Sequence, residues 1–361
     1  MRLLIVTNDY PPKAGGIQQY LGNLVAALDA EILVLAPAAD GDDAGVIRHS
    51  RRFIWPTRRV RRWVIGRAAE FAPDLILYGA PTPLPLMGPA VRRATGIPYA
   101  VLCHGAEVTI PAAFPVARQL LAYGLKRADL RFAVSEFTRA RVERLTGRPV
   151  EYLGAGVDVG AFSPGPAPAG SPVVGCVSRF VPRKGQRRVL RAASALHRQG
   201  RPLEVLLVGR GRNERRLRAL ASRLGVPVRF EVAVPWEALP GLYRQMTVFA
   251  MPCRSRWFGL EAEGLGLVFL EAAASGLPVL AGDSGGSPET VEPGVTGFVI
   301  SRDAHLVAGL EMLLGDPPRA AAMGESGRRR VLERFTWEAV ADRVAAAAVG
   351  LRGGTVGGDS S

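Results

Sequence analysis

Short apolar runs alternate with amphipathic stretches along the first half of the chain. Residues 3–7 (Leu-Leu-Ile-Val-Thr) form an apolar run typical of a buried strand, and from Ile17 to Leu28 apolar residues recur at helical spacing. Further apolar runs predict strands at 32–35, 75–78, 99–103 and 131–134, with helical stretches between several of them. Strands that alternate with helices indicate a parallel sheet covered on both faces.

A second block of the same kind follows residues 158–172, a segment rich in Gly, Pro, Ala and Ser that is typical of a linker. Its expected strands are 173–177, 205–208, 228–232, 248–251 and 279–281, and its expected helices are about 185–199, 213–224, 236–245 and 266–275. Both blocks therefore predict doubly wound α/β domains. Ligands of such sheets bind beyond the carboxyl ends of the strands, so we expect two facing domains to share one cleft.

These patterns place a first domain at residues 1–157 and a second at 173–335. The length of 361 residues suits two domains of ordinary size. Three helical stretches close the chain, at about 303–314, 317–333 and 336–349. The segment 351–361, rich in Gly and Ser, is expected to be a disordered tail.

Glu263 and Glu271 flank a glycine-rich loop and are eight residues apart. Glu271 falls among the small and apolar residues of the expected helix at 266–275, where an ionised carboxylate is costly unless something binds it. Carboxylates accept hydrogen bonds from hydroxyls, so this pair suits a polyhydroxylated ligand. The alternative is structural, namely a helix-capping acid and a buried salt bridge.

The loop after the expected strand at 173–177 holds three cations, Arg179, Arg183 and Lys184. Arg can bind two oxygens of one phosphate and Lys adds a point charge. The loop therefore suits a diphosphate, and the alternative is a solvated basic loop.

Gly15 and Gly16 occupy the equivalent place in the first domain, between its first strand and its first helix. Glycines there let the backbone and the helix N-terminus approach an anion, whereas the alternative is a tight turn. His104 follows the expected strand at 99–103 and should reach the same end of the sheet. It is either a structural histidine or a group that orients a reacting sugar or stabilises charge.

The formal charge of +14, from 46 basic and 32 acidic residues, favours anionic partners such as phosphorylated substrates or an acidic membrane surface. Residues 48–67 contain eight arginines and no acid. Within them Val60, Trp63 and Val64 follow helical spacing, with four arginines mainly on the other side: Arg58, Arg59, Arg61 and Arg62. This pattern is typical of a membrane-surface helix, or equally of a solvated helix packed on its own domain. Nucleic-acid binding is disfavoured, because no recognised nucleic-acid module accompanies the basic patch.

Three widely spaced cysteines give neither a disulfide framework nor a metal cluster, which fits a reduced cytoplasmic setting. The apolar run at the N-terminus is too short for a signal peptide, and no run approaches the roughly 20 apolar residues that span a bilayer. Any membrane contact is therefore expected to be peripheral. Asp40-Gly41-Asp42 has the form of a D-x-D metal motif but lies in a loop of Gly and Asp, so we expect no metal there.

Taken together, the two glutamates, the Arg179 to Lys184 loop, Gly15-Gly16 and His104-Gly105 resemble the retaining glycosyltransferases of family 4, which have the GT-B fold. The likeness extends to about residue 345. Within the family it is closest to the mannosyltransferases that use GDP-mannose and act on phosphatidylinositol monomannoside. The stretches that carry this closer likeness are 6–12 with 15–18, 179–186, 249–254 and 263–271.

The resemblance implies a role for each candidate residue. Arg179 and Lys184 would bind the donor diphosphate, Glu271 the ribose and Glu263 the transferred sugar. Gly15 and Gly16 would also lie at the diphosphate, and backbone amides near Gly285 and Gly286 would assist donor binding. Val234 would line the pocket of the base, and His104 would lie beside the sugar. Four arginines would contact anionic lipid: Arg58, Arg59, Arg61 and Arg62. The GT-B fold further implies no essential metal or cofactor, and a last helix at 336–350 that returns to the first domain.

The same resemblance implies an enzyme at the inner face of the cell membrane, with GDP-mannose as donor and a glycolipid as acceptor. Alternatives are a transferase with another nucleotide sugar or acceptor, and a non-catalytic nucleotide-sugar or polyanion-binding protein. Trp257 and Phe258 place bulk in the loop before Glu261, where close relatives have smaller residues.

Overall fold

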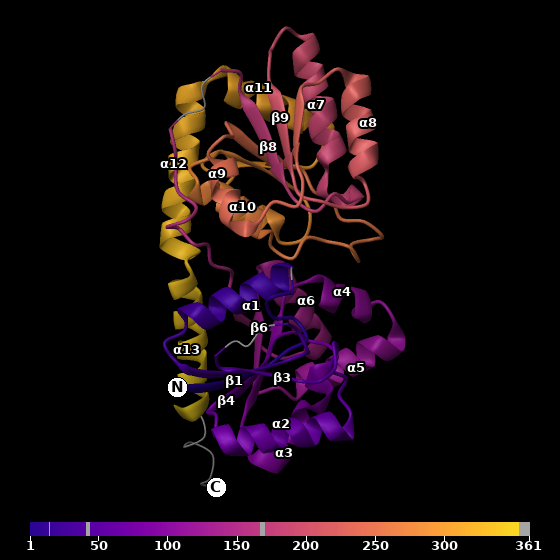
Figure 1. Cartoon of the computed structure of the whole chain (residues 1–361), viewed down its shortest axis with the longest axis vertical. Coiled ribbons are helices and arrows are strands. Elements are labelled where there is room, and N and C mark those ends of the chain that lie inside the picture. Colours follow the sequence, from indigo (N-terminus) through magenta and orange to yellow (C-terminus); the bar gives the residue numbers. More distant parts are fainter. Residues whose placement is uncertain (14, 41–43, 167–169, 354–361) are drawn as a thin grey trace. The chain divides into compact units, whose positions relative to one another are not determined.

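The computed structural model describes residues 1–13, 15–40, 44–166 and 170–353 (Figure 1). The chain divides into two compact units. Unit 1 comprises Met1–Gly156 and the C-terminal segment that starts at Trp337, and unit 2 is Val157–Thr336. Each unit is built on its own parallel sheet.

The sheet of unit 1 has seven parallel strands in the order β3-β2-β1-β4-β5-β6-β7. Their bounds are β1 (Arg2–Val6), β2 (Glu31–Ala36), β3 (Val46–Arg48), β4 (Leu75–Tyr78), β5 (Tyr99–Cys103), β6 (Leu130–Ala133) and β7 (Glu151–Tyr152). The five strands expected from apolar runs are present. The two that were not expected, β3 and β7, are short edge strands without a fully buried residue, so they lack the apolar run that marks the others.

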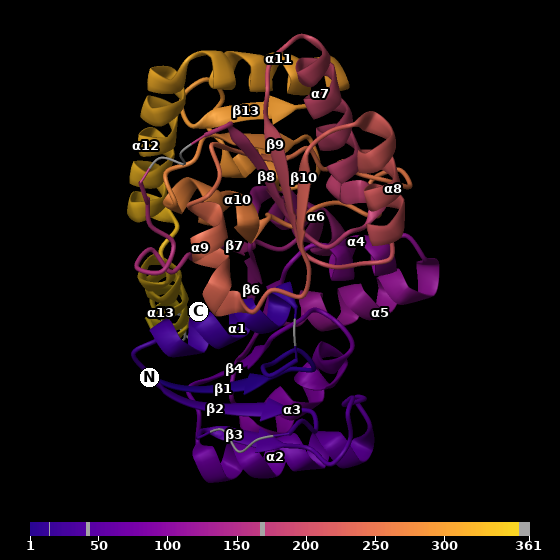
Figure 2. The ribbon, with the colours of Figure 1, turned by 45° about the horizontal axis from the view of Figure 1, so that its top comes forward.

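Helices cover both faces of this sheet, and Figure 2 shows α1 and α2 on opposite sides of it. The helical elements are α1 (Gly16–Ala27), α2 (Arg58–Phe71), η1 (Leu84–Met87), α3 (Gly88–Thr95), α4 (Ala106–Ala112), α5 (Pro115–Lys126), α6 (Glu136–Thr146) and α13 (Trp337–Gly353). Buried side chains of α2, α3, α5 and α6 belong to one hydrophobic core cluster with the strands.

The last helix, α13, packs against α1 within unit 1. The Trp337 and Tyr20 rings meet edge to face with centroids 5.1 Å apart, and Arg343 donates to the carbonyl oxygen of Leu153 at 2.6 Å. A Cβ on Gly156 would lie 2.5 Å from the Trp337 ring, so this contact leaves no room for a side chain there. The end of the chain thus completes the unit that its beginning forms.

The sheet of unit 2 has six parallel strands in the order β10-β9-β8-β11-β12-β13. Their bounds are β8 (Val173–Val177), β9 (Glu204–Val208), β10 (Val228–Glu231), β11 (Val248–Met251), β12 (Val279–Gly282) and β13 (Gly297–Ile300). Only β13 was not expected. It is a four-residue edge strand that begins with Gly and contains two partly exposed residues.

The helical elements of unit 2 are η2 (Pro182–Lys184), α7 (Gln186–Arg198), α8 (Glu214–Leu224), η3 (Trp236–Ala238), α9 (Leu239–Tyr243), α10 (Leu267–Ala274), η4 (Ser287–Thr290), α11 (Asp303–Gly315) and α12 (Pro317–Arg334). The single helix expected at 236–245 is instead a 3₁₀ turn followed by the short helix α9. Pro240, at the start of α9, lacks the amide needed to continue a regular helix from the preceding turn.

No helix in the described parts of the chain combines the length and the apolar character needed to cross a bilayer. Gly41 and Asp42 of the Asp40-Gly41-Asp42 motif lie outside the described residues. Residues 167–169 of the expected linker and 354–361 of the expected tail also lie outside them.

Candidate active site

The loops at the carboxyl ends of the unit 2 strands bring Lys184 and Glu263 together. Lys184 ends η2, which follows β8, and Glu263 lies in the loop between β11 and α10. The Lys184 Nζ atom is 2.8 Å from Glu263 Oε2, and Arg183 donates to the same oxygen. Both partners of the lysine pair are buried. The sequence singled out Glu263 and the cationic loop separately, and a buried salt bridge was its structural alternative for the glutamates. Arg183 was not expected to be one of the partners of Glu263.

Glu263 is ionised in this setting. Burial raises the pKa of its carboxyl group, but the positive charges of Lys184 and Arg183 outweigh burial and lower the pKa to about 2. Both cations bind Oε2, and no hydrogen bond from the described residues reaches Oε1. One oxygen of a fixed carboxylate is thus left to accept a hydrogen bond from a hydroxyl.

The segment Ser284 to Ser287 holds the backbone of Glu263. The Gly286 amide donates to the Glu263 carbonyl oxygen at 3.0 Å, and the Glu263 amide donates to Ser284 Oγ at 3.2 Å. Gly285 has a φ of +60°, and a Cβ there would lie 1.9 Å from the Glu263 carbonyl oxygen. The Gly286 amide, expected to face a ligand, is therefore engaged within the protein, and both glycines serve to position Glu263.

Glu271 lies on α10 and is bound differently. The Tyr243 hydroxyl, from α9, donates to Glu271 Oε2 at 2.8 Å. Burial raises the pKa of Glu271 to about 7, although the tyrosine hydrogen bond opposes this change. Tyr243 was not expected at the site. The available signal was a tyrosine among apolar helix positions, since a buried phenol needs a hydrogen-bond partner.

Arg179 and Val234 lie in loops that follow strands of the same sheet. Arg179 follows β8 and is exposed, and its side chain forms no hydrogen bond or ion pair with the described residues. The structure thus joins Lys184 to Arg183 and Glu263, and does not join it to Arg179. Val234 follows β10 and is partly buried.

Trp257 and Phe258 are both exposed in the loop before Glu261. Their φ angles are +50° and +55°, a left-handed conformation that is unusual for aromatic residues. Arg256 and Glu261 close this loop through an isolated bridge.

In unit 1, Gly15 and Gly16 lie where α1 begins. A Cβ on Gly16 would meet no atom within 4 Å, so the space beside this residue is open. A Cβ on Gly15 would lie 2.1 Å from Gln18 Oε1, and Gln18 in turn donates to Asp9 at 2.6 Å. Gly15 is therefore crowded by a side chain, whereas Gly16 is exposed and has open space beside its Cα atom.

His104 follows β5, and its Nε2 atom is 3.0 Å from the carbonyl oxygen of Gly79, which follows β4. Burial lowers the pKa of His104, against the opposing effect of Glu107 and the Gly79 hydrogen bond. A neutral imidazole that donates from Nε2 keeps Nδ1 as an acceptor. Glu107 accepts from the backbone amides of His104 and Gly105, which fixes the turn that carries the histidine.

The four arginines Arg58, Arg59, Arg61 and Arg62 of α2 are more exposed than the apolar residues that the same helix buries. Arg58, Arg59 and Arg62 are exposed and Arg61 is partly exposed. Val60, Val64 and Ala68 are buried, and Trp63 packs against the same core. The apolar face of α2 is therefore occupied by its own unit. Of the two interpretations that the sequence left open, the structure fits a helix packed on its own domain, and only the arginine side remains exposed.

Family comparisons agree with the two-part architecture. Residues 14–161 match the family Glycosyltransferase Family 4, and residues 162–330 match the family Glycosyl transferases group 1. The fold resembles that of Anabaena Alr3699/HepE in complex with UDP, with a TM-score of 0.81, 21% identity and coverage of 97% of this chain and 100% of that chain.

Two curated relatives match nearly the whole chain. The GDP-mannose-dependent α-(1-6)-phosphatidylinositol monomannoside mannosyltransferase of Mycolicibacterium smegmatis is 39% identical, covering 97% of this chain and 99% of the relative. The GDP-mannose-dependent monoacylated α-(1-6)-phosphatidylinositol monomannoside mannosyltransferase of Corynebacterium glutamicum is 36% identical, covering 95% and 96%. With two parallel-sheet units, both family matches and relatives of this identity along its length, the chain belongs to glycosyltransferase family 4 and has the GT-B class of fold.

Proposed function

We propose that this glycosyltransferase moves mannose from GDP-mannose to a phosphatidylinositol mannoside glycolipid, with retention of configuration at the sugar. The observation that carries the proposal is the 36–39% identity, over at least 95% of the chain, to relatives named for this donor and acceptor. The cluster of Lys184, Arg183 and Glu263 supplies chemistry that suits a sugar diphosphate.

The proposed donor site in unit 2 uses carboxylates, cations and one apolar residue. Glu263 Oε1 accepts from a hydroxyl of the transferred mannose, and Glu271 accepts from the ribose hydroxyls. Lys184 and the exposed Arg179 bind the diphosphate, and Val234 contacts the base. Ser284, Gly285 and Gly286 act indirectly, because they hold the Glu263 backbone.

In unit 1 the proposal assigns Gly15 and Gly16 to the diphosphate and His104 to the sugar. The open space beside Gly16 lets a ligand approach the backbone there. His104 is held by Gly79 and by the turn that Glu107 fixes, so its ring is positioned before any ligand binds.

Transfer breaks the bond between the sugar C1 and the diphosphate oxygen and forms a bond from C1 to the acceptor oxygen. Negative charge grows on the departing diphosphate, where fixed cations stabilise it as it develops. The departing phosphate oxygen accepts the proton of the acceptor hydroxyl, so the protein needs no separate base. The step as proposed uses neither a cofactor nor a metal.

The direct test is a transfer assay with labelled GDP-mannose and lipid vesicles that contain phosphatidylinositol monomannoside. We expect a dimannosylated lipid, and little label from UDP-glucose or UDP-galactose. Lys184→Ala and Glu263→Gln should each lower kcat/KM by roughly 10²–10³-fold, because they remove charges that act on the diphosphate or the sugar. Arg216→Gln, on the exposed side of α8, is the control and should retain activity.

Different outcomes separate the parts of the proposal. Transfer from another nucleotide sugar alone would replace the donor, and transfer to another lipid alone would replace the acceptor. Bound GDP-mannose without any transfer would favour the non-catalytic alternative.

We also propose that the enzyme works as a peripheral protein at the inner face of the cell membrane, with Arg58, Arg59, Arg61 and Arg62 near anionic lipid. The exposure of three of these arginines supports it, while the buried side of α2 limits the contact to electrostatic attraction. Flotation with anionic vesicles tests this part. If a variant with all four arginines changed to Gln floats like the wild type, α2 is not the contact.

A further inference from the structure

Five large apolar side chains of α4, α5 and the short segment between them are exposed on unit 1. Phe114 is 59% exposed, Val116 71% and Leu120 48%, with Ile110 and Tyr123 also exposed. Val116, Leu120 and Tyr123 are spaced by four and three residues, so they form one stripe along α5. The buried side of the same helix is formed by Leu121, Gly124 and Leu125. A second apolar stripe that faces solvent is typical of an interaction surface.

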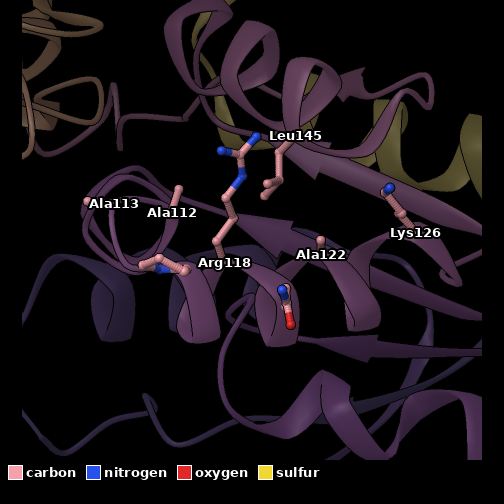
Figure 3. Close-up of a pocket in the computed structure, with 8 residues that line it drawn as sticks. Ala112, Ala113, Arg118, Ala122, Lys126 and Leu145 are labelled. Carbon is pink, nitrogen blue, oxygen red and sulfur yellow. The ribbon is translucent and has the colours of Figure 1, made fainter.

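A cationic groove lies beside this stripe. It has a volume of 460 Å³ and runs between α5, the end of α4 and the end of α6. Figure 3 shows Arg118 extending from α5 toward Leu145 of α6, with Lys126 on the same side of α5 and Ala112 and Ala122 nearby. Because residues 118, 122 and 126 are one helical turn apart, the groove face and the apolar stripe are neighbouring faces of one helix.

The groove continues toward α6, where Arg141 and Arg144 line a second hollow together with Arg118. In the described part of the chain no carboxylate lies within 4.0 Å of Arg118, Lys126, Arg141 or Arg144. On the same helix Arg139, by contrast, pairs with Glu136 at 3.0 Å and with Glu143 at 3.3 Å. Arg141 stacks on the Phe137 ring, with its guanidinium carbon 4.3 Å from the ring centroid. Four positive charges without a carboxylate partner therefore surround hollows that are otherwise lined mainly by apolar residues.

We propose that the α4–α5–α6 surface is the element that enters the membrane interface. The apolar stripe lies at the boundary between headgroups and acyl chains, and the cations of the groove bind the phosphates of anionic phospholipids. Exposed cations and exposed apolar side chains on adjoining faces fit an anionic membrane, because a helix at a membrane interface combines both. The α2 arginines cannot supply the apolar part, since the apolar side of α2 is buried. The inference rests on the proposed function in one respect, because an enzyme with a lipid acceptor has to reach a membrane.

Vesicle co-sedimentation of the full chain tests the proposal. Wild type should bind phosphatidylcholine vesicles that contain phosphatidylglycerol, and bind pure phosphatidylcholine more weakly. Arg118→Gln with Arg144→Gln should reduce affinity for the anionic vesicles about 25-fold, roughly fivefold for each charge. Val116→Ser with Leu120→Ser should reduce affinity for both kinds of vesicle about tenfold, since it removes apolar contact area.

The matched control is Arg215→Gln with Arg216→Gln on α8 of unit 2, which removes the same charge from an exposed surface. This control should bind like the wild type, and all variants should share its melting temperature because the changed side chains are exposed. If the α5 and α6 variants bind anionic vesicles like the control, the proposal is overturned. It is equally overturned if wild type sediments as a dimer that Leu120→Ser dissociates, since a second copy then covers the stripe.

An activity measurement separates this inference from the proposed function. With acceptor in vesicles, Val116→Ser with Leu120→Ser should reduce transfer, whereas hydrolysis of GDP-mannose or transfer to a short-chain acceptor dispersed in water should stay unchanged. A wild type that binds vesicles but never uses GDP-mannose would refute the proposed function and leave the membrane surface intact.

Discussion

Glu263 and Glu271 are two carboxyl groups close in sequence whose pKa values move in opposite directions. Burial raises the pKa of both groups, but Lys184 and Arg183 lower the pKa of Glu263 to about 2. Among the described residues the side chain of Glu271 has a phenol as its one hydrogen-bond partner, and its pKa rises to about 7. The Glu263 contribution to stability is present above its ordinary pKa of 4.5 and is lost as pH falls toward 2. The Glu271 contribution is present below 4.5 and is lost as pH rises toward 7.

The raised pKa of Glu271 predicts that the unfolding free energy falls as the pH rises from 4.5 to 7. A rise of the pKa from 4.5 to about 7 corresponds to at most roughly 3 kcal/mol of unfolding free energy. Glu271→Gln should remove this fall, because a neutral amide cannot ionise. Urea unfolding of both proteins across this pH range measures it, and parallel curves for variant and wild type would contradict the assignment.

Donor binding should also release a proton. If ribose hydroxyls donate to Glu271, they favour its ionised form, so near pH 6 GDP binding should drive off part of a proton. Calorimetry in two buffers with different ionisation enthalpies detects this release. The signal should vanish in Glu271→Gln and above pH 8, and its presence in that variant would assign the proton to another group.

At this scale the sequence predicts residue types better than pairings. It singled out Glu263 and the cationic loop, because both are unusual within their surroundings. It could not show which of Arg179, Arg183 and Lys184 turns inward, since three adjacent cations in a loop have no periodicity. The partnership of Tyr243 with Glu271 depends on the packing of α9 against α10, which no local pattern records.

Among elements, α2 shows how one pattern suits two structures. A basic amphipathic helix buries its apolar side either in a membrane or in its own domain, and the sequence pattern is the same. The structure selects the domain, with Val60, Val64 and Ala68 buried. Most strands, in contrast, were predictable, because a run buried on both faces of a parallel sheet is apolar throughout. The missing strands were the short ones at the sheet edges.

The packing of α2 gives a stability prediction. Val64→Asp places a charge in the core of unit 1 and should destabilise it by about 4 kcal/mol or more. Arg62→Gln, on the exposed side, should change the unfolding free energy by less than about 0.5 kcal/mol. Thermal unfolding of the two variants compares them. A mild effect of Val64→Asp would mean that α2 can leave its core.

At the scale of the whole molecule, α1 near the start of the chain and α13, the last described helix, pack together in unit 1. Val340, Ala341 and Val344 of α13 are buried, and Trp337 packs on Tyr20 and on the backbone at Gly156. The sequence predicted a helix here, and the family resemblance implied its return to the first domain. Neither identified α1 as its partner, because helical spacing does not name the surface that a helix packs against.

Trp337→Ala should therefore weaken the first unit rather than the second. Loss of the buried ring should cost about 3–5 kcal/mol. In hydrogen exchange, amides of β1 and α1 should lose protection while those of β8 and β9 keep it. Leu332→Ala on α12, which is 46% exposed, is the control and should change little. Equal loss in both units would show that they unfold as one.

The return of α13 also has a consequence for biosynthesis. The ribosome releases residues 157–336 before the helix that covers α1, so the middle of the polypeptide can finish folding while its beginning waits. A polypeptide that ends just before Trp337, once released from the ribosome, should carry a protease-resistant central portion and an N-terminal portion that is readily cleaved.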